Sequence, residues 1–148
     1  MQLHKEWLLK KDKQLYKGIK MIEIAPMITL PDFSEWEFNC KCGCGLNNMQ
    51  PIFLWKLQQC RAEAQVKFVI RSGSRCEQHN KDVGGREYSE HLTGEAADVY
   101  TANSHIRFKI LQAAFRIGFT RIGVGPTYIH LGNKRIAPQE VVWDYYPK

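Results

Sequence analysis

Apolar residues recur at helical spacing in two stretches of the chain, residues 48–64 and 103–117. In the first stretch they are Phe53, Leu54, Leu57, Cys60 and Ala64. In the second they are Ile106, Ile110, Leu111 and Ala114. Residues three or four positions apart share one face of an α-helix, so each stretch is predicted to be a helix with one buried side. Pro51 stands near the start of the first helix, while Ser104 is a candidate N-cap and Gly118 a stop signal for the second.

Shorter apolar runs between and after these helices predict strands. The predicted strands are residues 66–70, 95–100, 121–124, 128–131 and 141–143. The third and fourth flank a Gly125-Pro126 turn, and strands joined by a short turn must be antiparallel. Residues 72–88 read as a long polar loop, and loops of that length are often functional. The pattern predicts an α+β fold in which helices pack on a small, mostly antiparallel sheet.

The chain has 148 residues, enough for one domain with a buried core. We expect residues 1–32 to form an N-terminal extension, with a weakly patterned basic helix over 1–17, and residues 33–148 to form the domain. The first 20 residues carry six lysines without a continuous apolar run, so they do not resemble a secretory signal. No stretch is apolar enough to span a membrane. We therefore expect synthesis in the cytoplasm and no membrane partner.

The formal net charge is +6 and the pI is about 9.1, which favours anionic partners such as nucleic acid, anionic lipid or a cell-wall polymer. No basic stripe is interleaved with aromatic residues, and no nucleic-acid motif is present in the sequence. We expect no nucleic-acid partner and a monomeric protein.

The five cysteines are an odd number, so at least one is unpaired within the chain. Cys40, Cys42 and Cys44 are clustered, and their C-x-C-x-C spacing lacks the C-x₂-C step of zinc knuckles. Three states remain open for them: reduced thiols, one disulfide from the cluster to Cys76, or a structural second metal. Cys60 lies in a helical pattern and is expected to pack as a small hydrophobic residue.

The strongest chemical signal is the segment from Ser89 to Asp98, followed downstream by His130 within a predicted strand. It supplies His91, a carboxylate seven residues later at Asp98, and a second imidazole. Two histidines and one carboxylate bind Zn²⁺ and leave a fourth position open, as in catalytic zinc sites. A carboxylate between alanines and valine in a buried strand is also costly unless a cation or a partner compensates it.

Three segments of this region carry a family resemblance. They are Ser72-Gly73-Ser74-Arg75-Cys76-Glu77-Gln78-His79-Asn80, then Val83-Gly84-Gly85, then the pattern S-x-H-x-x-G-x-A-x-D at 89–98. Together they resemble the zinc D-Ala-D-Ala carboxypeptidase and L-alanyl-D-glutamate endopeptidase family, which includes phage endolysins and shares its fold with the hedgehog signalling domain. The resemblance extends over roughly residues 33–143, and the cysteine lead-in at 38–44 is similar to that of phage cell-wall peptidases.

The resemblance implies that His91, Asp98 and His130 bind zinc, and that Arg75 directs its guanidinium at a carboxylate or the developing oxyanion of the substrate. It implies that Ser89 orients the site or the peptide by a hydrogen bond. His79 occupies a polar loop position, for which a structural role is favoured. Zinc lowers the pKa of water from about 16 toward 7, which allows attack on a peptide carbonyl at neutral pH.

The sequence departs from the family at the catalytic acid. Family members place an acidic residue three positions before the last histidine or two positions after it, and this chain has Thr127 and Gly132 there. The spare carboxylates are Glu90, Glu95, Glu140 and Asp144.

The prediction is a zinc peptidase that cuts peptidoglycan stem peptides, an endolysin-like enzyme of D-Ala-D-Ala carboxypeptidase or L-Ala-D-Glu endopeptidase type that reaches the wall after release from the cell. The alternatives are a catalytically weak or inactive cell-wall-binding module, or a phage structural protein with the same fold.

Overall fold

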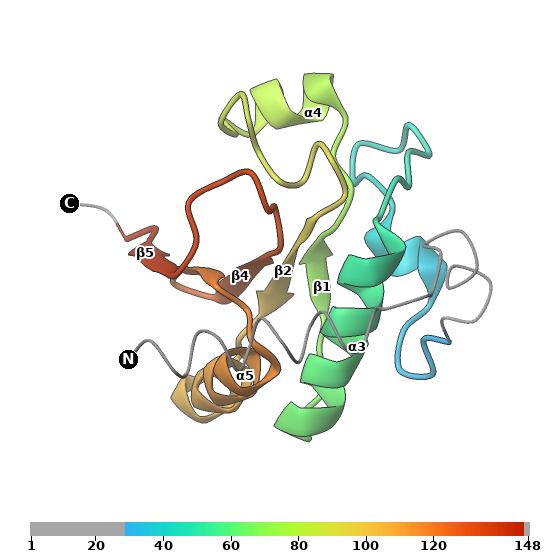
Figure 1. The fold of residues 1–148 in the computed structure, drawn as a ribbon. Helices are drawn as coiled ribbons and strands as arrows, with labels where there is room; N and C mark the ends of the chain where they lie inside the picture. The colour runs from blue at the N-terminus through green and yellow to red at the C-terminus, as the bar shows by residue number, and fades with distance from the viewer. Residues whose placement is uncertain (1–28, 147–148) are drawn as a thin grey trace, which may run out of the picture.

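The computed structural model describes residues 29–146, and Figure 1 shows their arrangement. The elements in chain order are η2 (Glu35–Phe38), α3 (Pro51–Ala64), β1 (Ile70–Ser72), α4 (Glu77–Asp82), β2 (Ala96–Tyr100), α5 (Ser104–Ile117), β3 (Arg121–Val124), β4 (Tyr128–Gly132) and β5 (Val141–Asp144). The predicted α+β fold is confirmed.

Five strands form one sheet in the order β1-β2-β4-β3-β5. Three of the four pairings are antiparallel, as predicted, but β5 runs parallel to β3 and makes the sheet mixed. The chain leaves β4, crosses through residues 133–140 and re-enters beside the start of β3, where Val141 N–H donates to Thr120 O at 2.9 Å. The crossover therefore sets the parallel direction of the edge strand.

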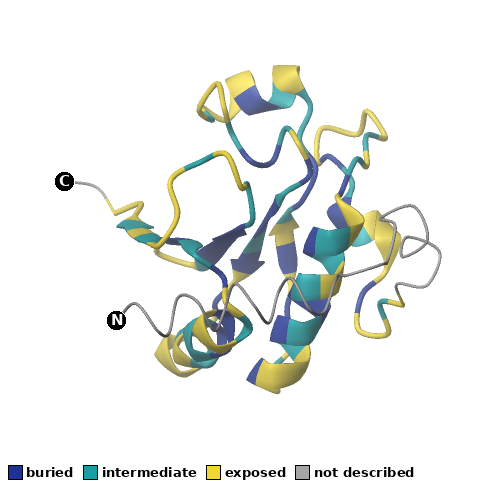
Figure 2. Cartoon of the chain, in the orientation of Figure 1, coloured by how far each residue is buried: buried dark blue, intermediate teal, exposed yellow. Residues whose placement is uncertain are grey.

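The hydrophobic core lies between the sheet and the helices α3 and α5. Phe53 and Leu57 from α3, Ile110 from α5, and Ile129 and Leu131 from β4 are fully buried in one cluster. Figure 2 shows the buried residues concentrated on the central strands and on the inner sides of both helices. Burying one such side chain contributes about 1.5–3 kcal/mol, so this packing holds the two helices against the sheet.

The predicted helices form, with corrections at both N-termini. The helix predicted over 48–64 begins at Pro51, because Gln50 is an extended N-cap residue. Pro51 occupies the first turn of α3, and Gly118 ends α5 in the left-handed conformation at φ 86°. The cap of α5 is Asn103 rather than Ser104, because the Asn103 side chain accepts the Ile106 N–H at 2.9 Å. The Ser104 prediction was therefore wrong by one position.

Two other expectations were wrong. The predicted strand at 66–70 lies at Ile70–Ser72 instead, and Phe68 packs in the core without joining the sheet. Segment 66–70 is rich in β-branched and aromatic residues because part of it is buried, and buried segments outside sheets also favour such residues. The predicted loop at 72–88 contains α4, whose six residues are too few to show hydrophobic periodicity.

The predicted basic helix at 1–17 lies outside the described residues. At the start of the described chain, Leu30 packs against the core and Asp32 accepts a 2.6 Å hydrogen bond from Gln58 Nε2. The division at residues 32 and 33 stays a prediction. Within the described residues, no helix combines the length and apolar character needed to cross a membrane.

Candidate metal centre

His91, Asp98 and His130 come together at one point, and one donor atom from each lies within 4.8 Å of the others. Asp98 and His130 are directly paired across β2 and β4. His91 Nε2 is 3.3 Å from Asp98 Oδ2, and His130 Nδ1 is 2.9 Å from Asp98 Oδ1. The two imidazole side chains are almost completely buried.

Local structure explains how the loop before β2 brings His91 to this point. Gly94 has φ +69°, and a Cβ there would lie 2.1 Å from the Asn48 carbonyl oxygen, so only glycine fits. Gln50 N–H donates to Gly94 O at 2.9 Å, which ties the loop to the start of α3. Ser89 Oγ accepts the His91 N–H at 3.3 Å.

The hydrogen bonds of the two histidines define which nitrogen of each ring faces Asp98. His91 Nδ1 is 2.8 Å from Gly73 O, and a carbonyl only accepts, so Nδ1 carries the proton and Nε2 faces Asp98. His130 Nε2 is 3.1 Å from Glu90 Oε2, which leaves Nδ1 facing Asp98. Metal-binding histidines characteristically donate their other ring N–H to a carbonyl or carboxylate. The donor set therefore fits a zinc ion.

Electrostatics at the centre match this arrangement. Burial opposes ionisation of Asp98, but hydrogen bonds from His130 and His91 outweigh it and hold the pKa of the carboxyl well below its usual range. Burial also opposes protonation of His130, while Asp98 and Glu90 raise its pKa to about 9. Both shifts have the same cause, the close approach of the His130 ring to the Asp98 carboxylate.

Glu90 is a site residue whose role the sequence did not reveal. Its carboxylate is buried and accepts from Arg121 Nε at 2.9 Å and from Lys134 N–H at 3.0 Å, besides its contact with His130. Burial raises its pKa, but these hydrogen bonds dominate and lower it to about 2. Glu90 is thus an ionised carboxylate committed to orienting His130.

Gly132 leaves the space that the Glu90 carboxylate fills, because a Cβ at residue 132 would lie 2.4 Å from Glu90 Oε2. At the other departure from the family pattern, Thr127 Oγ1 accepts from Arg71 at 2.7 Å. The structure thus supplies one carboxylate beside His130 from a different segment of the chain.

The other spare carboxylates point to no shared role at the centre. Glu95 accepts from the Thr93 hydroxyl at 2.6 Å, and Asp144 accepts from the Tyr146 N–H at 3.3 Å. Glu140 is exposed.

Arg75 lies at the edge of the centre, with Nη2 3.7 Å from Asp98 Oδ2. Nη2 also donates to Ser72 Oγ at 3.0 Å, and Nη1 donates to Asn80 Oδ1 at 3.2 Å. Asn80 is a buried residue of α4 that closes the motif segment 72–80, although the sequence assigned it no role. His79, on the same helix, is not among the three converging donors, and its backbone N–H donates to Cys76 Sγ at 3.4 Å.

Aromatic rings form a wall beside His130. Trp143 of β5 lies 5.4 Å from the His130 ring, and Tyr145 lies 5.5 Å from Tyr128, measured between ring centroids. Burial, followed by the charge of Asp98, raises the pKa of Tyr128 to about 12. Gly123 makes this packing possible, since a Cβ there would lie 2.5 Å from the Tyr145 ring. The aromatic run after residue 142 was the only sequence signal for this wall.

Comparisons with known proteins identify the family of this chain. A zinc D-Ala-D-Ala carboxypeptidase from Streptomyces albus G is 38% identical over 78 residues, which are 52% of this chain and 30% of that protein. The chain thus matches less than a third of that relative's length. The family model described as Peptidase M15 matches residues 31–132, a stretch that holds all three converging donors. Because that match covers well over half of the sequence, the chain belongs to the Peptidase M15 family, as its sequence motifs indicated.

Proposed function

We propose that this protein is a zinc-dependent peptidase that hydrolyses peptide bonds in peptidoglycan stem peptides. The observation that carries the proposal is the convergence of His91, Asp98 and His130 inside the stretch matched by a peptidase family. The named relative supports both zinc as the cofactor and a D-Ala-containing peptide as the substrate class.

The three donors would hold zinc through His91 Nε2, an Asp98 carboxylate oxygen and His130 Nδ1. Bound zinc supplies Lewis-acid polarisation of the peptide carbonyl and lowers the pKa of water toward about 7. Glu90 keeps His130 in the tautomer that offers Nδ1, and the Gly73 carbonyl does the same for Nε2 of His91.

Arg75 would bind the substrate. An arginine guanidinium presents a planar, positively charged fork of donors, which suits a carboxylate or a carbonyl oxygen that gains charge. Ser72 and Asn80 hold that fork beside Asp98. Ser89 would act indirectly, because its hydroxyl oxygen accepts the His91 N–H and so fixes the backbone at His91.

The endolysin-like setting belongs to the same proposal. The net charge of +6 favours association with an anionic wall, and a peptidase that waits in the cytoplasm would act once the membrane opens.

One observation favours a second candidate, a cell-wall-binding module with little or no turnover. Positions 127 and 132 carry no acid, and the nearby carboxylate of Glu90 is engaged by three donors. Such a module would bind zinc and the wall without releasing fragments.

The test is a digest of purified peptidoglycan with the zinc-loaded protein, in which the released fragments are read by mass spectrometry. We expect new stem-peptide termini, which identify the bond as D-Ala-D-Ala or L-Ala-D-Glu. His91→Ala removes a proposed metal ligand and should release none. Glu95→Gln should cut normally, because among residues 29–146 the Glu95 carboxylate is hydrogen-bonded to the Thr93 hydroxyl and not to the metal centre.

An absence of fragments from protein that still holds zinc at this centre would contradict turnover and support the binding module. Fragments released equally by His91→Ala would contradict the assignment of the site.

A further inference from the structure

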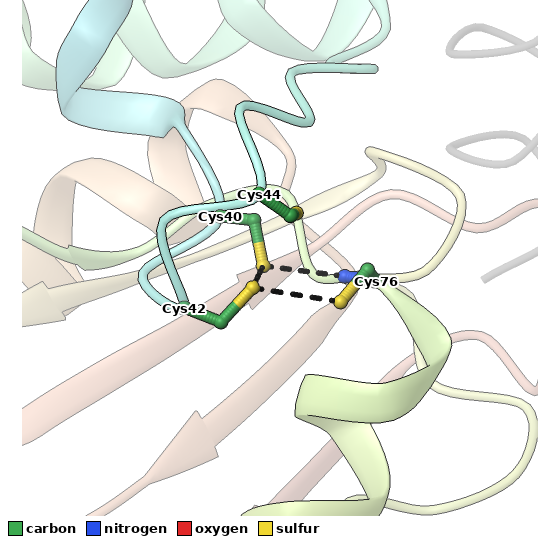
Figure 3. Close-up of side chains that lie close together, drawn as sticks. All are labelled: Cys40, Cys42, Cys44 and Cys76. Carbon is green, nitrogen blue, oxygen red and sulfur yellow. Dashed lines mark hydrogen bonds between the residues drawn. The ribbon is translucent and has the colours of Figure 1, made fainter.

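Four of the five cysteines lie together on the side of the molecule formed by the loop before α3 and the start of α4. Cys40, Cys42 and Cys44 come from that loop, and Cys76 directly precedes α4 (Figure 3). Their sulfur atoms all lie within 4.8 Å of one another. The sequence had left the state of these residues open between free thiols, a disulfide and a metal site.

The sulfur separations match a metal site better than a disulfide. Cys40 Sγ is 3.4 Å from Cys42 Sγ, which is 3.7 Å from Cys76 Sγ. Four thiolates at about 2.3 Å from a tetrahedral zinc ion have sulfur-sulfur distances of about 3.8 Å. A disulfide requires about 2.05 Å, and all five cysteines are free in the structure.

The backbone around the cluster is arranged to support thiolates. Cys76 N–H donates to Cys40 Sγ at 3.4 Å, and His79 N–H donates to Cys76 Sγ at 3.4 Å. Hydrogen bonds of this kind stabilise negative charge on metal ligands. Gly43 and Gly45 have φ +86° and +79°, and these left-handed turns let one short loop direct three thiols to one point.

We propose that Cys40, Cys42, Cys44 and Cys76 bind a structural zinc ion, separate from the centre at His91, Asp98 and His130. Four protein ligands close the coordination shell and leave no position for substrate, as in structural zinc sites. Binding releases the thiol protons to solvent and transfers no electron. The atypical C-x-C-x-C spacing is explained because the fourth ligand comes from a distant segment.

The position of this site gives it a consequence for the rest of the fold. Cys76 follows Arg75 directly, and Ser74 N–H donates to Phe38 O at 2.9 Å, so the two segments already run side by side. A metal at the four sulfurs would join the loop before α3 to the segment that carries Arg75. Its role is to hold that segment in place.

The test is the zinc content of the full chain, purified with a thiol reductant and excess zinc and then desalted. We expect two zinc ions per chain for the unaltered protein and one for His91→Ala. Cys42→Ser removes one of the four proposed ligands and should also retain one ion. Because Cys42 is exposed, this change leaves the core intact. The control is Cys60→Ala, which alters a cysteine buried in the core and should retain both ions.

Cobalt substitution distinguishes the two centres without relying on a cysteine variant. We expect thiolate-to-cobalt charge-transfer absorption in the near ultraviolet that persists in His91→Ala, because only the cysteine site has sulfur ligands. Should Cys42→Ser fail to fold, the zinc count and cobalt spectrum of His91→Ala decide the question.

Three results would overturn the proposal. One is the finding that His91→Ala is folded but binds no metal. Another is a cobalt spectrum without thiolate absorption. The third is an intact mass lower by two hydrogens under the same conditions, which would show a disulfide in place of the metal.

Discussion

At the scale of single residues, the centre depends on groups that lie behind the three donors. Glu90 and the Gly73 carbonyl each take one ring N–H and thereby set which nitrogen faces Asp98. Glu90 also forms an ion pair with Arg121, whose side chain is partly buried. Glu90 and His91 are adjacent in sequence but have different places at the centre. His91 contributes one of the three converging donor atoms, whereas Glu90 contacts the ring of His130.

Replacement of Glu90 by Gln should weaken zinc binding by about 10–100-fold, the usual effect of removing a partner behind a metal ligand. The amide keeps the size of the side chain but loses the charge that holds His130 and Arg121. Competition with a chelator of known affinity measures the change. Glu95→Gln serves as the matched control and should bind zinc normally. Equal affinity in both variants would contradict the role given to Glu90.

Gly132→Ala tests whether the Glu90 carboxylate is held in a fixed position. Its Cβ would stand 2.4 Å from Glu90 Oε2, in a buried region where the carboxylate is held by Arg121 and Lys134. We expect lower stability, by about 1–3 kcal/mol, as for overpacked interiors. Urea unfolding measures it, and a variant as stable as the parent would show that Glu90 can move.

At the scale of elements, the sheet determines where the donors lie. Asp98 and His130 are cross-strand partners on β2 and β4, so their side chains share one face of the sheet. Because side chains alternate along a strand, a register shift of one residue would separate them. The core that these strands share with α3 and α5 favours this register, because a shift would turn the buried strand residues away from it.

The N-cap of α5 can be tested directly. Asn103→Ala should destabilise the protein by about 1 kcal/mol, since it removes the acceptor of the Ile106 N–H. Ser104→Ala should change stability by less than about 0.5 kcal/mol, because Ser104 is the first helical residue and not the cap. Equilibrium urea unfolding compares the two variants. The reverse order of effects would place the cap at Ser104, as the sequence had suggested.

At the scale of the whole molecule, zinc binding and folding are linked. His91, Asp98 and His130 come from a loop and two strands, so they form a site only in the folded chain. A ligand that binds only the native state stabilises it, by about 2.7 kcal/mol at a concentration 100-fold above Kd.

Chelation should therefore lower the melting temperature of the unaltered protein by more than that of His91→Ala. The difference between the two shifts reports this centre alone, because His91→Ala retains the four clustered cysteines. At a free zinc concentration 100-fold above Kd, the contribution should be roughly 10 °C for a domain of this size. Thermal unfolding followed by circular dichroism gives both shifts, and equal shifts would contradict zinc binding through His91.

The sequence by itself determined the two long helices and the segments that became β2, β3 and β4. It also predicted the three residues whose donor atoms converge. Those features are local, since helical periodicity, strand composition and the spacing of a motif are all written in consecutive residues. The family resemblance was local for the same reason, and its main segments lie within residues 72–98.

Only the tertiary structure decided which groups support those donors. Glu90 and Trp143 both contact the His130 ring. They lie 40 residues before it and 13 after it, a spacing that neither helical nor strand periodicity predicts. The fourth cysteine of the cluster likewise arrives from the segment after β1. The direction of β5 follows from the crossover that precedes it. Such pairings depend on the packing of distant segments, which composition and spacing do not specify.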